Sequence, residues 1–153
     1  CDWSSDVCSS DLYDWIPLSD DEMVAAVPPD HELAPDGPYP LARCQEETVI
    51  MPALGKDDDV LQLLKKNNLQ PRIGYTTLEN SAAISMVEEG LGISIMNRLI
   101  TRKRVTSAVL LPLDPPASIT LGIAFLPGNA ASPTVRKFAQ YALAITTHRP
   151  ITE

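Results

Sequence analysis

Cysteine and histidine are the residue types best suited to metal binding and nucleophilic chemistry, and this chain has few of them. Its 153 residues contain Cys1, Cys8, Cys44, His31 and His148. No C-x-x-C pair occurs and the two histidines are far apart, so the spacing of a structural zinc site is missing. The sequence also has no G-x-G-x-x-G, P-loop or G-x-S-x-G motif. We therefore expect no catalytic residue, no metal ligand and no cofactor, and predict that the protein is not an enzyme. His31 is predicted to fix a turn through a side-chain to backbone hydrogen bond, and Cys44 to be an inert thiol.

Three consecutive acids, residues 57–59, are the next candidates for metal chemistry. They stand directly before an apolar segment at 60–64, which Lys65 and Lys66 follow. Acids in the first turn and bases in the last turn suit the helix dipole. The pattern therefore favours the start of a helix over a Mg²⁺ site, since no partner carboxylates can be placed beside the three acids.

Hydroxyl and amide groups gather at the end of a predicted strand. Thr76 and Thr77 stand where this strand meets a helix, and hydroxyls and free N–H groups at such a place suit a carboxylate. The spacing from Thr76 to Glu79 also has the Thr-x-x-Glu form of a capping box, so capping alone is the competing interpretation. Asn80 and Ser81, on the first turn, are weaker candidates for ligand binding.

These residues must be positioned by alternating strands and helices. Apolar runs predict strands at 23–27, 48–51, 72–77, 92–96, 108–113 and 118–125. Helical spacing predicts helices at 57–66, 76–90, 97–103 and 132–145, the last with Ser132 as its N-cap. The apolar faces of the second and last helices are predicted to be Leu78, Ala82 and Met86 with Ala83 and Val87, and Val135, Phe138, Ala139 and Ala142.

Apolar strands and short connections indicate an α/β fold with a mainly parallel sheet that is covered on both faces. In such sheets ligands bind at the carboxyl ends of the strands. The candidate site therefore comprises the loops at 52–57, 76–80 and 96–97. Gly55, Lys56 and Met96 join the candidate ligand residues, although a lone loop lysine is usually surface and Met96 fits the core better.

Residues 1–12, CDWSSDVCSSDL, differ in character from everything that follows. They show neither a helical nor a strand period, and in order they match the translation of a widely used short-read sequencing adapter. We expect this segment to be non-native and the native sequence to start at about Tyr13.

Composition excludes several functions. The formal net charge is −8 and no basic face is evident, which argues against direct nucleic-acid binding. No apolar run approaches the roughly 20 residues that span a bilayer. Outside residues 1–12 only Cys44 remains, as a reducing cytoplasm permits, so the predicted location is cytoplasmic.

Four ordered blocks, residues 23–34, 49–60, 69–97 and 109–116, resemble the effector-binding domain of LysR-type transcriptional regulators. The most specific is SMVEEGLGISIM, residues 85–96, in which a helix, a tight glycine turn and a strand of small residues follow one another. Two departures stand out: Glu32 occupies a place where the family often has proline, and Arg98 one where related sequences often carry an acid.

The resemblance implies a type 2 periplasmic-binding-protein-like fold of two lobes that hold a small effector in the cleft between them. Residues 23–113 would form the second lobe, residues 13–22 and 114–147 a remnant of the first, and residues 148–153 a tail. The N-terminal winged helix-turn-helix would be absent from this chain.

The function implied is sensing of a small anionic metabolite, which controls DNA binding by the absent domain. The implied partners are the effector, further copies in a homodimer or tetramer of the full-length protein, and DNA only through the absent domain, with no membrane. Apolar surface should be exposed where the partner and the missing strands belong, which predicts poor solubility for this chain alone. The alternative function is a periplasmic solute-binding protein, which would share the fold and the cleft.

Overall fold

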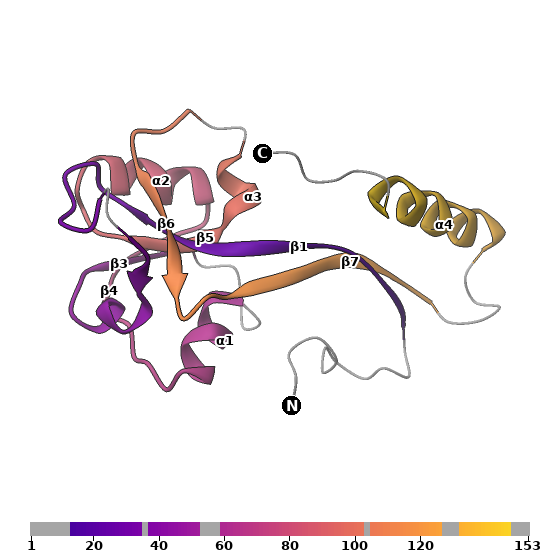
Figure 1. The fold of residues 1–153 in the computed structure, drawn as a ribbon, viewed down its shortest axis with the longest axis horizontal. Coiled ribbons are helices and arrows are strands. Elements are labelled where there is room, and N and C mark those ends of the chain that lie inside the picture. The colour runs from indigo at the N-terminus through magenta and orange to yellow at the C-terminus, as the bar shows by residue number, and fades with distance from the viewer. Residues whose placement is uncertain (1–12, 35–36, 53–58, 103–104, 127–131, 148–153) are drawn as a thin grey trace. The chain divides into compact units, whose positions relative to one another are not determined.

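The computed structural model describes residues 13–34, 37–52, 59–102, 105–126 and 132–147 (Figure 1). The side chains of residues 146 and 147 are not described. Residues 1–12 and the tail 148–153 therefore lie outside the described part. The elements in chain order are β1 (Asp14–Val27), β2 (Tyr39–Pro40), the 3₁₀ helix η1 (Leu41–Gln45), β3 (Val49–Pro52), α1 (Asp59–Lys66), β4 (Ile73–Thr77), α2 (Asn80–Glu88), β5 (Ser94–Asn97), α3 (Arg98–Thr101), β6 (Val109–Asp114), β7 (Ser118–Phe125) and α4 (Pro133–Thr147). Each predicted strand and helix is confirmed to within a few residues, except that β1 is much longer than the predicted strand at 23–27 and α2 begins later than predicted.

The chain divides into two compact units. Unit 2 is Glu22–Ser118, and unit 1 combines Cys1–Asp21 with Ile119–Glu153. In unit 1 the first part of β1 pairs with β7, and the Thr120 hydroxyl donates a 2.7 Å hydrogen bond to Asp20 Oδ1. The division of the chain into lobes at 23 and 113 stays a prediction.

Strand direction in unit 2 differs from the sequence-based expectation. β1 pairs antiparallel with β5 and with β6, whereas β2 pairs parallel with β6 and β3 pairs parallel with β4. A parallel bridge between Val49 and Ile93 links β3 to the start of β5. The prediction of a mainly parallel sheet was wrong, because a strand buried on both faces has the same apolar run whichever way it points.

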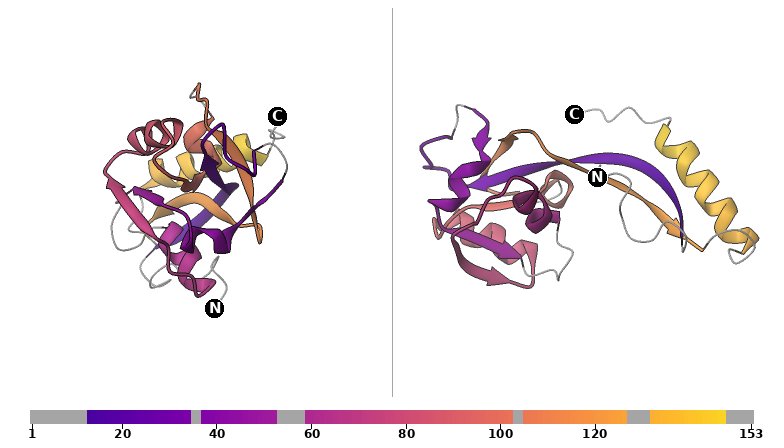
Figure 2. Two further views of the ribbon diagram at one scale, coloured as in Figure 1. Left: turned by 90° about the vertical axis from the view of Figure 1, so that its left-hand side faces the viewer. Right: turned by 90° about the horizontal axis from the view of Figure 1, so that it is seen from below.

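The core of unit 2 lies on both faces of these strands. On one face Val24, Ala26, Ile50 and Met96 form a buried cluster with α2, which contributes Ala83, Ile84 and Val87. Successive strand residues face opposite sides, so Ala25, Val27 and Ile95, all buried, belong to the other face. Figures 1 and 2 show α1 and α2 on opposite sides of the strands of unit 2, which explains why β3 and the last five residues of β1 are buried on both faces.

Helix α2 ends in the glycine turn that the sequence predicts. Gly90 has φ +73°, its N–H donates to Val87 O at 2.9 Å, and the N–H of Leu91 donates to Met86 O at 3.0 Å. This pair of bonds is a Schellman motif, which satisfies the last carbonyls of the helix.

Gly92 lets two backbones approach each other at the start of β5. A Cβ at this position would lie 2.3 Å from Thr48 O, which itself accepts the N–H of Ile93 at 2.9 Å. The short sequence between α2 and β5 thus fixes the distance between β5 and β3. Ser94 reinforces the pairing, since its buried hydroxyl donates to Ile50 O at 2.8 Å.

Two details of helix α2 correct the predictions. α2 begins at Asn80, its N-cap is Glu79, and no side chain caps it, so the Thr76–Glu79 capping box is wrong. The side chain of Leu78 is 79% exposed and Ala82 is also exposed, because Leu78 precedes the helix and the buried face is that of Ala83 and Val87.

Helix α4 is partly as predicted. The N–H of Val135 donates to Ser132 Oγ at 3.3 Å, which confirms the predicted cap, and Ala139 is buried. Val135 and Phe138 were predicted to face inward, but they are exposed, Phe138 at 64%. Most of the apolar side of α4 thus has no cover among the described residues.

We predict that Gly92→Ala destabilises the protein by about 1–3 kcal/mol, because the new methyl group would overlap a backbone carbonyl that is already hydrogen-bonded. The measurement is the free energy of unfolding from urea titration. Gly37→Ala is the matched control, since a Cβ there meets nothing within 4 Å. Equal stability of the two variants would contradict the role given to Gly92.

Candidate functional site

The carboxyl ends of three strands meet at one edge of unit 2. Register pairs Pro52 of β3 with Thr77 of β4, and β5 runs parallel to β3. Met23, where β1 enters unit 2, pairs with Asn97 at the end of β5. We call this the carboxyl edge, defined by Pro52, Thr77 and Asn97. It brings together the strand ends at which the sequence placed the candidate site.

The two threonines of β4 differ in their surroundings. Thr76 is exposed, whereas Thr77 is half-buried and makes a tight turn with Glu79. The hydroxyl of Thr77 donates to Glu79 O at 2.7 Å and accepts the N–H of Glu79 at 3.0 Å. Asn80 and Ser81 follow on the first turn of α2, half-buried and exposed. All four stay predicted ligand residues.

The remaining predicted site residues lie elsewhere. Gly55 and Lys56 fall outside the described residues. Met96 is 1% exposed and packs in the core of unit 2, as the sequence favoured for its side chain. Its participation in ligand binding stays a prediction.

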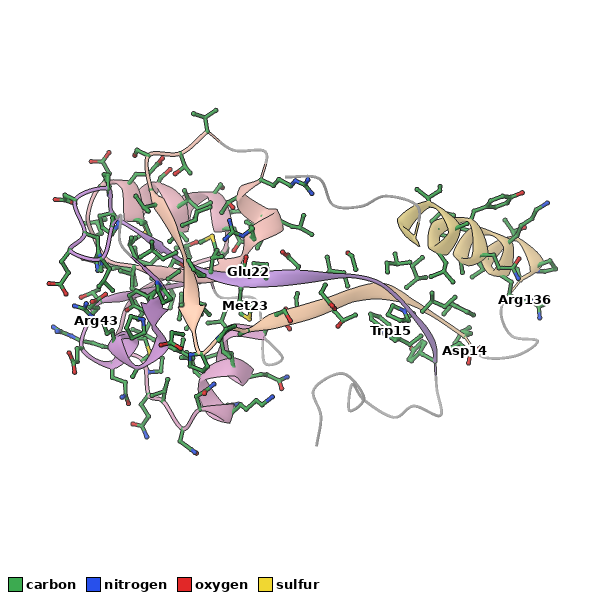
Figure 3. All side chains as sticks on the ribbon, in the orientation of Figure 1. Asp14, Trp15, Glu22, Met23, Arg43 and Arg136 are labelled. Atoms are coloured by element: carbon green, nitrogen blue, oxygen red, sulfur yellow. The ribbon has the colours of Figure 1, made fainter. Side chains whose placement is uncertain are left out.

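An ion pair that the sequence did not reveal lies at the carboxyl edge. Arg98 Nε is 2.7 Å from Glu22 Oε2, and the two side chains are 46% and 45% exposed. Glu22 and Met23 are labelled on β1 in Figure 3. The signal available in the sequence was the basic residue at 98, but its partner is 76 positions away.

A second polar cluster centres on Glu47. Tyr39 OH donates to Glu47 Oε2 at 3.0 Å, His31 Nε2 lies 3.3 Å from the same oxygen, and Arg43 Nε lies 2.9 Å from Glu47 Oε1. Arg43, labelled in Figure 3, also pairs with Glu32. The charges and hydrogen-bonding groups of the cluster therefore satisfy one another.

His31 performs the structural role that was predicted for it. The N–H of Leu33 donates to His31 Nδ1 at 3.2 Å, which confirms the expected side-chain to backbone bond. Because Nδ1 accepts, the neutral ring carries its proton on Nε2 and donates it to Glu47. His31 thereby ties the loop after β1 to the segment after η1.

The environment shifts the pKa of several members of this cluster. Burial, with the nearby Glu47 carboxylate, raises the pKa of Tyr39 well above its usual range. The hydrogen bond from Arg43 lowers the pKa of Glu32, and the same bond raises the pKa of Arg43. Burial also raises the pKa of the Cys44 thiol, which lowers its thiolate fraction and agrees with the predicted inert role.

An open pocket of about 430 Å³ adjoins this cluster. It is lined by Pro28, His31, Glu32, Arg43, Glu47, Thr48 and the segment 90–93. These residues lie at the beginnings of β3 and β5 and at the end of β1, so the pocket is at the opposite edge from the strand ends of the candidate site. In the described part of the chain, no group of three or more His, Cys, Asp or Glu side chains could hold a metal ion.

Membrane insertion through a helix finds no support in the described residues, since none of their helices is both long and apolar enough to cross a bilayer.

Comparisons with known proteins agree with the geometry. The family model of the LysR substrate binding domain matches residues 4–146. A Bacillus subtilis (strain 168) protein, described as an uncharacterized HTH-type transcriptional regulator YybE, is 32% identical over 139 residues, which are 85% of this chain and 45% of that relative. The chain thus spans less than half the length of this curated relative.

The solved structures of similar fold include two regulator domains bound to small ligands. The Synechocystis PCC6803 CcmR regulatory domain in complex with 2-PG has a TM-score of 0.80 at 22% identity, over 93% of this chain and 71% of that one. The effector binding domain of QuiR in complex with shikimate has a TM-score of 0.75 at 23% identity, over 92% and 68%. These likenesses confirm the type 2 periplasmic-binding-protein-like fold class expected from the sequence.

We predict that Glu47→Gln lowers the free energy of unfolding by about 1–3 kcal/mol, since a charged acceptor shared by His31, Tyr39 and Arg43 is replaced by a neutral amide. Urea titration measures the change. Glu46→Gln is the matched control, because Glu46 is exposed, and it should change stability by less than about 0.5 kcal/mol. Similar values for both variants would show that the cluster does not stabilise the fold.

Proposed function

Because the chain belongs to the LysR substrate-binding domain family, we propose that it is the effector-sensing part of a bacterial transcriptional regulator. The observation that carries this proposal is the family match over residues 4–146. The carboxyl edge of unit 2 supports it, since β3, β4 and β5 run parallel to one another and ligands of α/β sheets bind at the carboxyl ends of parallel strands.

The effector in this proposal is a small anionic metabolite that binds against the carboxyl edge. Thr76 and Thr77 supply hydroxyls there, Asn80 and Ser81 lie on the adjoining first turn of α2, and Asn97 ends β5. Two neighbours in fold are complexes with small ligands, 2-PG for CcmR and shikimate for QuiR, which supports a small-molecule effector here.

The DNA-binding function is proposed to reside outside this chain, in an N-terminal winged helix-turn-helix. The relative whose name describes it as HTH-type is more than twice as long as the matched segment. The acidic composition of the chain agrees with this division of roles. In the intact protein we expect a cytoplasmic homodimer or tetramer in which effector binding shifts the population of DNA-binding states.

Residues 13–22 and 114–147 are proposed to be a remnant of the first lobe, and most of them belong to unit 1. Its described residues leave large apolar side chains exposed, namely Tyr13, Trp15, Leu121, Leu126, Val135, Phe138, Tyr141, Leu143 and Ile145. Such a concentration is unusual for a free surface and fits a lobe whose remaining strands are supplied by other sequence.

The competing function, a periplasmic solute-binding protein, shares the fold. Membership of the LysR substrate-binding domain family favours the regulator. An enzyme is disfavoured, since the curated relative is a transcriptional regulator and no catalytic constellation was identified in the sequence.

We predict that a screen of small organic acids will identify a compound that raises the melting temperature by about 5–10 °C at roughly 100 times its Kd, because a ligand that binds only the folded state stabilises it. Thr77→Val should abolish the shift, and Thr134→Val, on exposed α4, should leave it unchanged. The same compound should alter promoter binding by the full-length regulator. A stabilising compound that the protein instead converts chemically would contradict the sensor function.

We also predict that the chain alone associates in solution through the apolar side chains of unit 1. Light scattering after size exclusion should report masses above that of one chain, and the double variant Phe138→Lys, Tyr141→Lys should reduce them. Lys137→Glu, on the same helix, is the control and should leave the mass unchanged. A monodisperse wild-type monomer that melts cooperatively would contradict the proposal that unit 1 is a remnant of the first lobe.

A further inference from the structure

Arg98 and Glu22 form an ion pair at the carboxyl edge, where the proposed function places the effector. Met23 and Asn97 are register partners, so Glu22, which precedes Met23 on β1, and Arg98, which follows the end of β5 and begins α3, lie beside each other at the end of the ladder. The Nε of Arg98 lies 2.7 Å from Glu22 Oε2. Both residues belong to unit 2, so this placement does not depend on unit 1.

The pair is accessible to a dissolved ligand. Its side chains are 46% and 45% exposed. An ion pair in contact with solvent contributes little to stability, so a competing anion can share or replace it at small cost. A guanidinium has five N–H donors in a planar fork, and a contact at Nε leaves its Nη1–Nη2 edge geometrically suited to a carboxylate.

Other groups at this edge are suited to the same ligand. The side chain of Asn97 makes no capping bond to α3, and Thr76 is exposed on β4. The Asn97 amide adjoins the Arg98 guanidinium and adds a donor for a carboxylate, whereas the Thr76 hydroxyl lies farther along the same edge, because β3 stands between β4 and β5.

The surrounding charge makes Arg98 decisive for the sign of the ligand. The neighbouring charges are acidic: Glu22 precedes the paired part of β1, and Asp114 ends β6, two residues after the Pro112 that pairs with Val24. Both acids are exposed, so without Arg98 this part of the edge would be acidic and would repel an anion.

We propose that Arg98 is a ligand-binding residue that selects a carboxylate-bearing effector, and that Glu22 is a positioning residue that holds the Nε side of its guanidinium. This inference rests on the proposed function, because it names the ligand class and a specificity residue of the same site. The acid at 22 also competes with the ligand, so its charge sets how tightly an anion binds.

Saturation-transfer NMR on the 153-residue chain tests the proposal, with succinate as the probe and uncharged succinamide as its matched neutral analogue. The method detects weak binding and tolerates self-association of the protein. We expect saturation to be transferred from the protein to succinate but not to succinamide. Arg98→Gln should weaken succinate binding at least tenfold, and Arg98→Lys should weaken it less. The exposed Arg102, replaced by glutamine, is the control and should change it less than twofold.

Glu22→Gln gives a readout that a purely structural pair would not give. The amide still accepts the Nε–H bond but no longer competes as an anion, so succinate should bind two- to fivefold more tightly. Weaker binding in this variant would overturn the role given to Glu22. Circular dichroism shows whether each variant is folded. If Arg98→Gln is not folded, Arg98→Lys takes its place in the binding test.

Three outcomes would overturn the proposal. Succinate binding that survives Arg98→Gln but is lost in Thr77→Val removes Arg98 from the site and leaves the sensor function intact. Equal transfer to succinamide shows that charge is not selected. If the wild-type chain does not bind succinate, a carboxylate is the wrong class, and the independent melting screen still decides whether another small molecule is sensed.

Discussion

β1 is the strand on which the arrangement of unit 2 depends. It is fully buried over its last five residues, Met23 to Val27, and it lies between β5 and β6, antiparallel to both. Because register along β1 fixes where each neighbour ends, it also fixes which side chains meet at the carboxyl edge. The ladder between β1 and β5 thus brings Glu22 and Arg98 together, although they are distant in sequence.

The two edges of the strands in unit 2 have different polar chemistry. At the edge where β3 and β5 begin, Glu47 accepts hydrogen bonds from three partners and His31 accepts a backbone N–H, so the polar groups satisfy one another. At the carboxyl edge the hydroxyls are exposed or form only local turns, and an ion pair is half exposed to solvent. The first arrangement stabilises the fold, and the second leaves donors for a ligand.

Local sequence patterns predict the structure correctly where hydrogen bonds join groups that are only a few residues apart. The Gly90 turn, the Ser132 cap and the His31 bond all join groups within five positions of one another. Errors arose where a local pattern had two solutions. Glu79 forms a turn with Thr77 in place of the capping box predicted for Thr76 and Glu79. The apolar residues of α4 likewise do not indicate whether another element covers them.

The sequence by itself determined the order of the elements, the apolar strands, the family and the strand ends at which a site was expected. Only the tertiary structure decided strand direction, the exposure of Phe138 and the partners of Arg43 and Arg98. The physical reason is that periodicity encodes which face of an element is buried, whereas direction, register and ion pairing depend on which elements become neighbours. Glu22 and Arg98 show this directly, because neither residue is informative until β1 and β5 lie side by side.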